Sequence, residues 1–144
     1  MSATNAFETA LLQLIFNGTA IASLAQNASA SPYTTFYISL HTGDPGEAGT
    51  QASAETAYTG YARLAVTRDG TGWTISGNEA TNAAQIAFGL CTANPDSPIT
   101  HFGIGTSLSG SGNLLFSDPL DSPVAMQVGV TPIFSAGALK VQCS

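Results

Sequence analysis

The amino-acid sequence predicts an all-β fold, an antiparallel jelly-roll-like sandwich or barrel of 7–8 strands that follows an N-terminal helix. Two observations predict the strands. Short runs after residue 33 alternate apolar with polar residues, and turn signals rich in Gly, Pro, Asn and Asp separate these runs. A third observation argues against a parallel sheet, because no helical pattern alternates with the strands. The length of 144 residues suits one domain, which we expect to span residues 1–144.

The N-terminal segment, residues 5–26, has the pattern of a helix. Asn5 can cap its first turn, and Glu8 three residues later can complete a capping box. Asn17-Gly18 then forms a C-cap or turn, after which residues 19–26 would add a second short helical turn. Four apolar residues recur at helical spacing and predict a stripe that packs on the chain's own β core, with a neighbouring molecule as the alternative: Phe7, Leu11, Leu14 and Ile15.

The β core is expected over residues 33–144. The first run shows the period of two, because Phe36, Ile38 and Leu40 share one face and the residues between them share the other. Prolines separate most of the runs, and Pro132 near a run indicates a sheet edge or a bulge. The runs span residues 36–41, 61–67, 73–75, 82–88, 99–105, 114–116 and 124–130, with 133–134 and 139–143 closing the chain.

The composition is poor in charge. Only 12 residues are charged, three basic and nine acidic, which is 8% of the chain against about 25% in an ordinary domain. Hydrophobic residues make up 44%, so disorder is not expected. Two interpretations remain open: an acidic soluble protein with a neutral polar surface, or a protein whose surface is largely covered by partners, since interface cores are depleted in charge.

The charge and hydropathy exclude some classes of partner. The net charge is −6, and Arg63, Arg68 and Lys140 are too few and too scattered to bind a phosphate backbone, so we expect no nucleic-acid partner. No run approaches the roughly 20 apolar residues of a membrane span, and no secretory signal is expected. Cys91 and Cys143 are expected to be free thiols of a protein made in a reducing cytoplasm.

The histidines do not have the spacing of a metal site. His41 and His101 would need a third ligand such as Asp44 or Glu47, and the pattern around His41 matches no recognised ligand spacing. We therefore expect no metal. His41 is instead expected at a strand end, on the face turned to solvent or to a partner.

Other chemical motifs are also weak. No serine lies in a Gly-x-Ser-x-Gly elbow. Gly103-Ile104-Gly105 lies inside a predicted strand and indicates close packing of the backbone rather than dinucleotide binding. A pair of glycosidase carboxylates would have to come from one Gly-rich loop with Asp44, Glu47 and Glu55, where rigid placement is hard. We expect no catalytic residue, no cofactor and no enzymatic activity.

The candidate functional residues are therefore those of an interface. Arg63 lies beside Tyr61 on the face opposite Leu64 and is either an interface anchor or a lone solvated arginine. Exposed tyrosines could also serve a glycan binder, whereas Trp73 is expected in the core. The interface candidates are Tyr37, His41, Tyr58, Tyr61 and Arg63.

Several motifs along the chain together carry a resemblance. They are ALLQLIFNGTA at residues 10–20, FYISLHT at 36–42, GDPGEAG at 43–49, YTGYAR at 58–63, ITHFGI at 99–104, GNLLF at 112–116 and FSAGAL at 134–139. In this order they resemble a widespread family of small tailed-phage structural proteins. Members are often labelled phage tail fibre proteins, and some resemble the cement, or decoration, proteins of phage heads. Leu40–Gly49 and Tyr58–Arg63 are the most specific parts.

The resemblance implies a jelly-roll-like protein that binds the outer surface of a tailed-phage capsid. It would stabilise contacts between major capsid subunits, as a homodimer across two-fold positions, after synthesis in the cytoplasm of the bacterial host. The family has no catalytic motif to transfer. Fibre shafts are long, trimeric and repetitive, whereas this chain is short and has no repeat. We therefore expect a capsid cement protein, with a tail-fibre or tail-tip receptor-binding module as the alternative.

Overall fold

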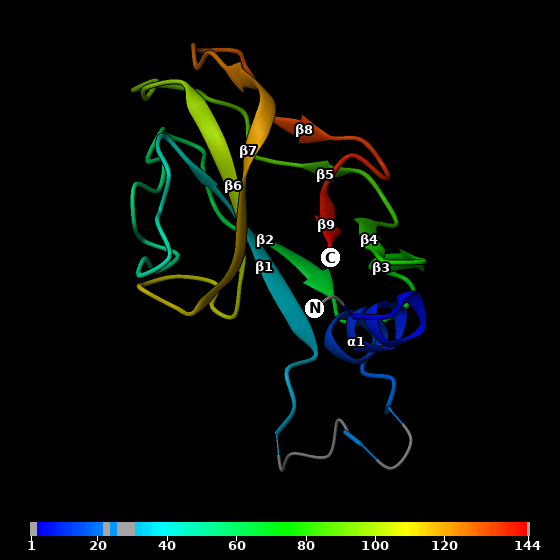
Figure 1. Cartoon of the computed structure of the whole chain (residues 1–144). Coiled ribbons are helices and arrows are strands. Elements are labelled where there is room, and N and C mark those ends of the chain that lie inside the picture. Colours follow the sequence, from blue (N-terminus) through cyan, green and yellow to red (C-terminus); the bar gives the residue numbers. More distant parts are fainter. Residues whose placement is uncertain (1–2, 22–23, 26–30, 144) are drawn as a thin grey trace. The chain divides into compact units, whose positions relative to one another are not determined.

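A computed structural model describes residues 3–21, 24–25 and 31–143 as one helix and nine strands (Figure 1). The predicted fold class, all-β with an N-terminal helix, is confirmed. The chain's internal contacts form two compact units. Unit 1 comprises Met1–Thr35, Val66–Ile86 and Phe134–Ser144, and unit 2 comprises Phe36–Ala65 and Ala87–Ile133. That the whole chain is one domain stays a prediction.

Helix α1 of unit 1 spans Asn5–Asn17 and is shorter than the expected segment 5–26. Thr4, rather than Asn5, caps it, because the Thr4 hydroxyl accepts a hydrogen bond from the amide of Phe7 at 3.4 Å. Gly18, with a left-handed φ of 67°, ends the helix at the expected C-cap. Beyond it Ile21 pairs with Ala25 in an antiparallel bridge. Residues 22, 23 and 26 of the expected segment lie outside the described residues.

The buried face of α1 differs from the predicted stripe. Glu8, Leu12 and Phe16, each four residues apart, are buried, whereas Phe7 is 42% exposed. The prediction was wrong because residues 10–16 are apolar on every side except at Gln13, so the periodicity does not single out one face. The ring of Phe16 packs on that of Trp73 with centroids 4.6 Å apart, so α1 packs on its own chain.

The sheet of unit 1 has the strand order β3-β4-β9 and is antiparallel. Its strands are β3 (Trp73–Ser76), β4 (Glu79–Asn82) and β9 (Lys140–Gln142). Asn82 is buried, and its side chain donates to the carbonyls of Ala84 at 2.7 Å and Ser135 at 2.9 Å, and accepts from the amide of Leu139 at 2.8 Å. This one amide group therefore ties the C-terminal segment to β4.

The larger sheet has the order β2-β1-β6-β7, and its central pair belongs to unit 2. Its strands are β1 (Thr35–His41), β2 (Leu64–Thr67), β6 (Ile99–Gly105) and β7 (Leu114–Val124). β1 and β6 are antiparallel, with Ile38 opposite Ile104 and Leu40 opposite Phe102, and all four side chains are buried. This pair forms the apolar core of unit 2.

A two-stranded sheet joins β5 (Ile86–Ala87) to β8 (Ile133–Phe134). Both cysteines, Cys91 and Cys143, carry free thiols. Within the described part of the chain, no helix combines the length and the apolar character needed to cross a membrane.

Strand β7 is longer than predicted, and the expected strand 124–130 is not formed. β7 continues through Pro119 and Pro123, which were expected between strands. A proline cannot donate to the hydrogen-bonding ladder and is tolerated on edge strands and at bulges. β7 is an edge strand, and its pairing with β6 shifts register between Ile99 and His101. Position at the edge, which no local pattern reveals, therefore accommodates both prolines.

Candidate functional site

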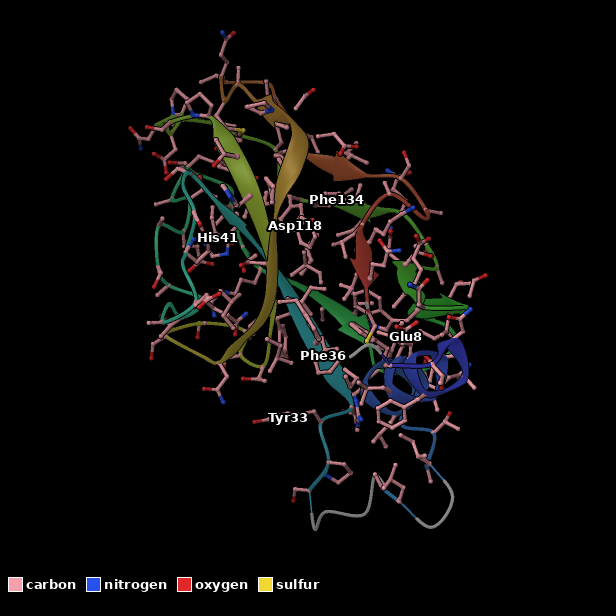
Figure 2. All side chains as sticks on the ribbon, in the orientation of Figure 1. Glu8, Tyr33, Phe36, His41, Asp118 and Phe134 are labelled. Atoms are coloured by element: carbon pink, nitrogen blue, oxygen red, sulfur yellow. The ribbon has the colours of Figure 1, made fainter. Side chains whose placement is uncertain are left out.

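Unit 2 contains a buried layer of polar side chains, called here the polar network. Ser39, His41 and Gln51 are 0% exposed, although His41 stands at the end of β1 (Figure 2). Buried polar groups of this kind are costly unless each finds a hydrogen-bond partner. The members of the network are Ser39, His41, Gln51, Glu55, Tyr61 and Arg63.

The first part of the network is a hydrogen-bonded chain through His41. Its Nδ1 lies 2.8 Å from the carbonyl oxygen of Ser53, and its Nε2 lies 2.8 Å from Oγ of Ser39. Because a carbonyl only accepts, Nδ1 carries the proton and Nε2 of the neutral ring accepts from the Ser39 hydroxyl. A Cβ at Gly103 on β6 would lie 2.7 Å from both His41 Nε2 and Ser39 Oγ, so the close backbone packing predicted for Gly103-Ile104-Gly105 is confirmed.

The second part is a bidentate ion pair. Arg63 Nε donates to Glu55 Oε1 and its Nη2 donates to Oε2, both at 2.7 Å, and the side chains are only 3% and 17% exposed. The hydroxyl of Tyr61 donates to the same carboxylate at 2.7 Å. The hydrogen bonds that Arg63 donates to Glu55 raise the pKa of Arg63, and burial raises the pKa of Tyr61. The arginine also donates to the carbonyls of Ser107 at 3.0 Å and Gly110 at 2.6 Å.

The third part is Gln51, which joins a loop to a turn. Its side-chain Oε1 accepts from the amide of Ser107 at 2.9 Å, and the backbone amide of Gln51 donates to the carbonyl of Ser111 at 2.9 Å. A Cβ at Gly105 would lie 2.1 Å from Cδ of Gln51, and one at Gly112 would lie 2.3 Å from its Oε1. Glycines on both sides thus leave the space that Gln51 fills. The polar network holds the loop of residues 42–60 and the turn of residues 106–113 to the sheet.

The geometry of the polar network favours a structural role for the Ser39 hydroxyl and the His41 imidazole. A hydrogen-bonded Ser–His pair can activate a nucleophile when the hydroxyl reaches substrate. Here both Ser39 and His41 are fully buried, and the second ring nitrogen binds a backbone carbonyl rather than an orienting carboxylate. Over residues 3–21, 24–25 and 31–143, no three His, Cys, Asp or Glu residues are grouped so that they could hold a metal ion.

The five interface candidates lie mostly inside unit 2. His41 is 0% exposed, Tyr58 is 2% exposed and Arg63 is 5% exposed, while Tyr37 and Tyr61 are half-buried. The expected outward position of His41 is wrong. Arg63 is neither a solvated arginine nor an exposed anchor, because it is buried on the carboxylate described above. A role of these residues in partner contacts stays a prediction.

The loop of residues 42–60 explains why these predicted interface residues are buried. The residue pair His41 and Glu55 forms an antiparallel bridge, so the loop of residues 42–60 covers the end of β1. Tyr58 is enclosed in the same way, since its hydroxyl donates to the carbonyl of Gly89 at 2.9 Å and burial raises its pKa to about 12. The sequence pattern gave the alternation along β1 but contained no signal for a loop that folds back over it.

Sequence reasoning missed other members of the arrangement. Asp96 anchors the far end of the loop, because its carboxylate accepts from the amide of Ala57 and from the Thr56 hydroxyl. The Ala57 amide in particular lowers the pKa of Asp96. Gln51 and Ser39 were also not identified. The signal available in the sequence was the pair Gly103 and Gly105 in β6, because glycines leave the space that the side chains of His41 and Gln51 occupy.

The buried imidazole predicts a dependence of stability on pH. Burial lowers the pKa of His41 below 6.5, so below about pH 6.5 the unfolded chain binds a proton that the folded chain does not. We expect the free energy of unfolding to fall as the pH falls from about 6.5 to the lowered pKa, by at most about 1.4 kcal/mol per pH unit. Urea unfolding over this range measures the slope.

Two variants test whether His41 causes this dependence of the free energy of unfolding on pH. His41→Gln keeps a donor and an acceptor but does not titrate, so it should flatten the curve in this range, whereas His101→Gln should leave it in place. The same slope in His41→Gln would contradict the assignment. The Asp96 carboxylate acts in a separate window, because its pKa is lowered from 3.8 and its stabilisation is lost only as the pH falls below about 4.

A comparison with known families matches nearly the whole chain. The model of a family described as Podophage GP4 fiber I protein gp80 matches residues 2–142. The matched range runs through both compact units and includes every residue of the polar network. No curated protein matches the chain.

Proposed function

We propose, from the premise that this chain belongs to the podophage GP4 fiber I protein gp80 family, that it is a globular module of a tail fibre. Membership makes the chain a bacteriophage structural protein, located in the virion. The observation that carries the fibre proposal is the extent of the match, which covers nearly the whole chain. This match supports a tail-fibre module, which was the alternative expected from the sequence, better than it supports the capsid cement protein that was expected first.

The form of the chain narrows the kind of fibre component. A shaft is built from repeated sequence, whereas residues 1–144 contain no repeat. Unit 2 instead holds a loop and a turn to a rigid sheet through the polar network. Loops placed by a rigid scaffold are common sites of recognition. We therefore propose a compact tip or attachment module that contacts the host surface.

Other expectations from the sequence remain part of this proposal. The module associates with itself, binds no nucleic acid, enters no membrane, needs no cofactor and catalyses no reaction. The buried Ser39 and His41 support the last point, because their side chains are 0% exposed. Two of the three basic side chains, Arg63 and Lys140, support the expectation about nucleic acid, because each is paired with a carboxylate.

Capsid cement is the second candidate, and the charge content favours it. A chain in which 8% of all residues are charged would lose little charge solvation on covering the joints between major capsid subunits. This role would place the protein on the outer surface of the head, with the major capsid protein as its partner.

Purified particles distinguish the two candidates. Antibody labelling and quantitative mass spectrometry measure the position and the copy number of the protein. A tail-fibre module should be found at the tail, at a stoichiometry near that of other tail proteins. Labelling over the whole head at a stoichiometry near that of the major capsid protein would overturn the fibre proposal.

Particles that lack the protein give a second test. A fibre module predicts reduced adsorption to host cells with an unchanged temperature of DNA release, because the head remains intact. Normal adsorption together with DNA release at a lower temperature would support the cement role instead.

A further inference from the structure

Residues 42–54, called here the cover segment, lie over the end of β1 with very little apolar contact. They contain no Val, Leu, Ile, Met or aromatic residue. Among their apolar residues only Pro45 is buried, whereas the three alanines are exposed. A segment with few buried apolar contacts opens at a lower free-energy cost than the core it covers. Hydrogen bonds rather than apolar burial therefore keep the cover segment in place.

Two of these hydrogen bonds lie at His41 or directly beside it. The carbonyl of Ser53 accepts from Nδ1 of His41 at 2.8 Å, and the carbonyl of Ala54 accepts from the amide of Thr42 at 2.8 Å. The His41 side chain is 0% exposed, because the bridge between His41 and Glu55 places the cover segment over it. Displacement of the segment would therefore bring the imidazole into contact with water.

The cover segment has a hinge at its C-terminal end. Ala54 has a left-handed φ of 51°, a conformation that a residue with a Cβ rarely adopts. The next two residues are clamped, because Glu55 pairs with Arg63 and the hydroxyl of Thr56 donates to Asp96 at 3.1 Å. Rotation at Ala54 would relieve its strained φ and leave both clamps in place. Conformational hinges are loop residues that absorb such a change in φ.

The charged groups that face His41 come from three parts of unit 2. Glu55 follows the cover segment, but its carboxylate is already bound by Arg63 and by the Tyr61 hydroxyl, so this ion pair is neutral as it stands. Arg63 itself is positive, and His101 on β6 lies directly opposite His41 in the antiparallel register. A protonated His41 would therefore add an uncompensated charge to the closed form, where like charges on opposed residues repel.

We propose that protonation of His41 releases the cover segment from β1 by rotation at Ala54, so that unit 2 is closed at neutral pH and open in mild acid. Burial lowers the pKa of His41, although the Ser53 carbonyl and Glu55 act in the opposite sense. In the open form the imidazole meets water and takes up a proton near its ordinary pKa of about 6.5. Acid therefore favours the open form, because that form binds the proton more tightly.

The core of unit 2 does not depend on the cover segment. Side chains along β1 and β6 alternate between two faces, so the pairs Ile38–Ile104 and Leu40–Phe102 lie on the face opposite His41. This apolar face stays packed when the segment leaves the polar one. Release is therefore a local change and not unfolding of the unit.

Release of the cover segment would also loosen the turn of residues 106–113. Gln51 binds this turn from the segment, whereas Arg63 would stay bound to two of its carbonyls. A loop and a turn that are held together at neutral pH would then separate in acid. The inference goes beyond the proposed function, since this release is a property of unit 2 in a fibre and in a head coat alike.

Native-state hydrogen exchange of the full chain tests the release, with each amide followed by NMR in low concentrations of urea. The amides of Thr42 and Gln51 report on the cover segment, because they donate to the carbonyls of Ala54 and Ser111. The most protected amides of the β1–β6 ladder report on unfolding of unit 2. Opening of the segment alone exposes little surface, so exchange at the two reporters should not depend on urea, whereas exchange in the ladder should rise steeply with it.

Acid should favour the opening. From about pH 7.5 to about pH 5, the protection of both reporters, corrected for the intrinsic rate of exchange, should fall about tenfold, because only the open form binds the proton readily. His41→Gln should show no such fall, since its side chain does not titrate. His101→Gln is the matched control and should keep the fall, because His41 still titrates in it.

Several results would overturn the proposal. One is a wild type whose reporters keep their protection in acid, and another is the same fall in His41→Gln. Reporters that match the ladder in protection and in urea dependence would show that the segment opens only when unit 2 unfolds. If His41→Gln does not fold, the carbon-bound ring protons of the wild-type histidines replace it. The fall should then level off at the pH at which the folded His41 ring titrates, and levelling off with His101 instead would contradict the assignment.

Discussion

Glu55→Ala is expected to lower the free energy of unfolding by about 3–5 kcal/mol, because it leaves the Arg63 guanidinium buried without its counter-ion. The arginine side chain is 3% exposed, and the variant removes both 2.7 Å contacts of its bidentate pair. The carbonyls of Ser107 and Gly110 would remain as its partners, but they do not neutralise the charge. Urea denaturation of the wild type and the variant at pH 7 measures the difference.

The chain contains a matched control for this substitution. Glu79 pairs with Lys140 at 2.9 Å, but the side chains are 30% and 54% exposed. Surface ion pairs contribute about 0–1 kcal/mol, so Glu79→Ala should have a small effect. The double variant Glu55→Leu/Arg63→Met removes both buried charges and should recover much of the loss. Equal effects of Glu55→Ala and Glu79→Ala would contradict a buried, tightly coupled pair.

Gly105→Ala is expected to lower the free energy of unfolding by about 1–3 kcal/mol through overpacking. The added Cβ would lie 2.1 Å from Cδ and 2.4 Å from Cγ of Gln51, which is fully buried and cannot move into solvent. The displaced amide would also lose its hydrogen bond from Ser107. Hydrogen exchange at the Ser107 amide should therefore increase together with the loss measured by urea denaturation.

A double-mutant cycle identifies the cause of that loss. Gly105→Ala should cost much less in the background of Gln51→Ala, where the space opposite is empty. Gly43→Ala is the control, because its Cβ would meet only the Ala54 methyl at an ordinary 3.7 Å. That variant should leave stability nearly unchanged. Full additivity of the Gly105 and Gln51 substitutions would show that the two residues are not in contact.

Local patterns were sufficient where the chain follows its own periodicity. The alternation over residues 99–105 predicted the bounds of β6, and the run from Phe36 to His41 predicted all but the first residue of β1. Trp73 is buried, as expected from its apolar strand. These elements depend on neighbouring residues in the sequence, and their side chains face a core on at least one side.

Local patterns failed where partners come from distant parts of the chain. The prolines of β7 indicated a break, but an edge position makes both tolerable. The face of α1 could not be selected in a segment apolar on nearly every side. The outward face assigned to His41 became an inner face, because the bridge to Glu55 brings a loop over it.

The amino-acid sequence alone was enough for the all-β class, the N-terminal helix and the relation to phage structural proteins, since these rest on periodicity, turn residues and motif order. Only the tertiary structure decided that three of the candidate interface residues, His41, Tyr61 and Arg63, belong to the polar network. Arg63 and Glu55 lie eight residues apart, yet Arg63 also donates to the carbonyls of Ser107 and Gly110, which lie more than forty residues away in the chain. Burial is a property of what covers a side chain, and for His41 and Arg63 that cover is a loop and a turn brought together by folding.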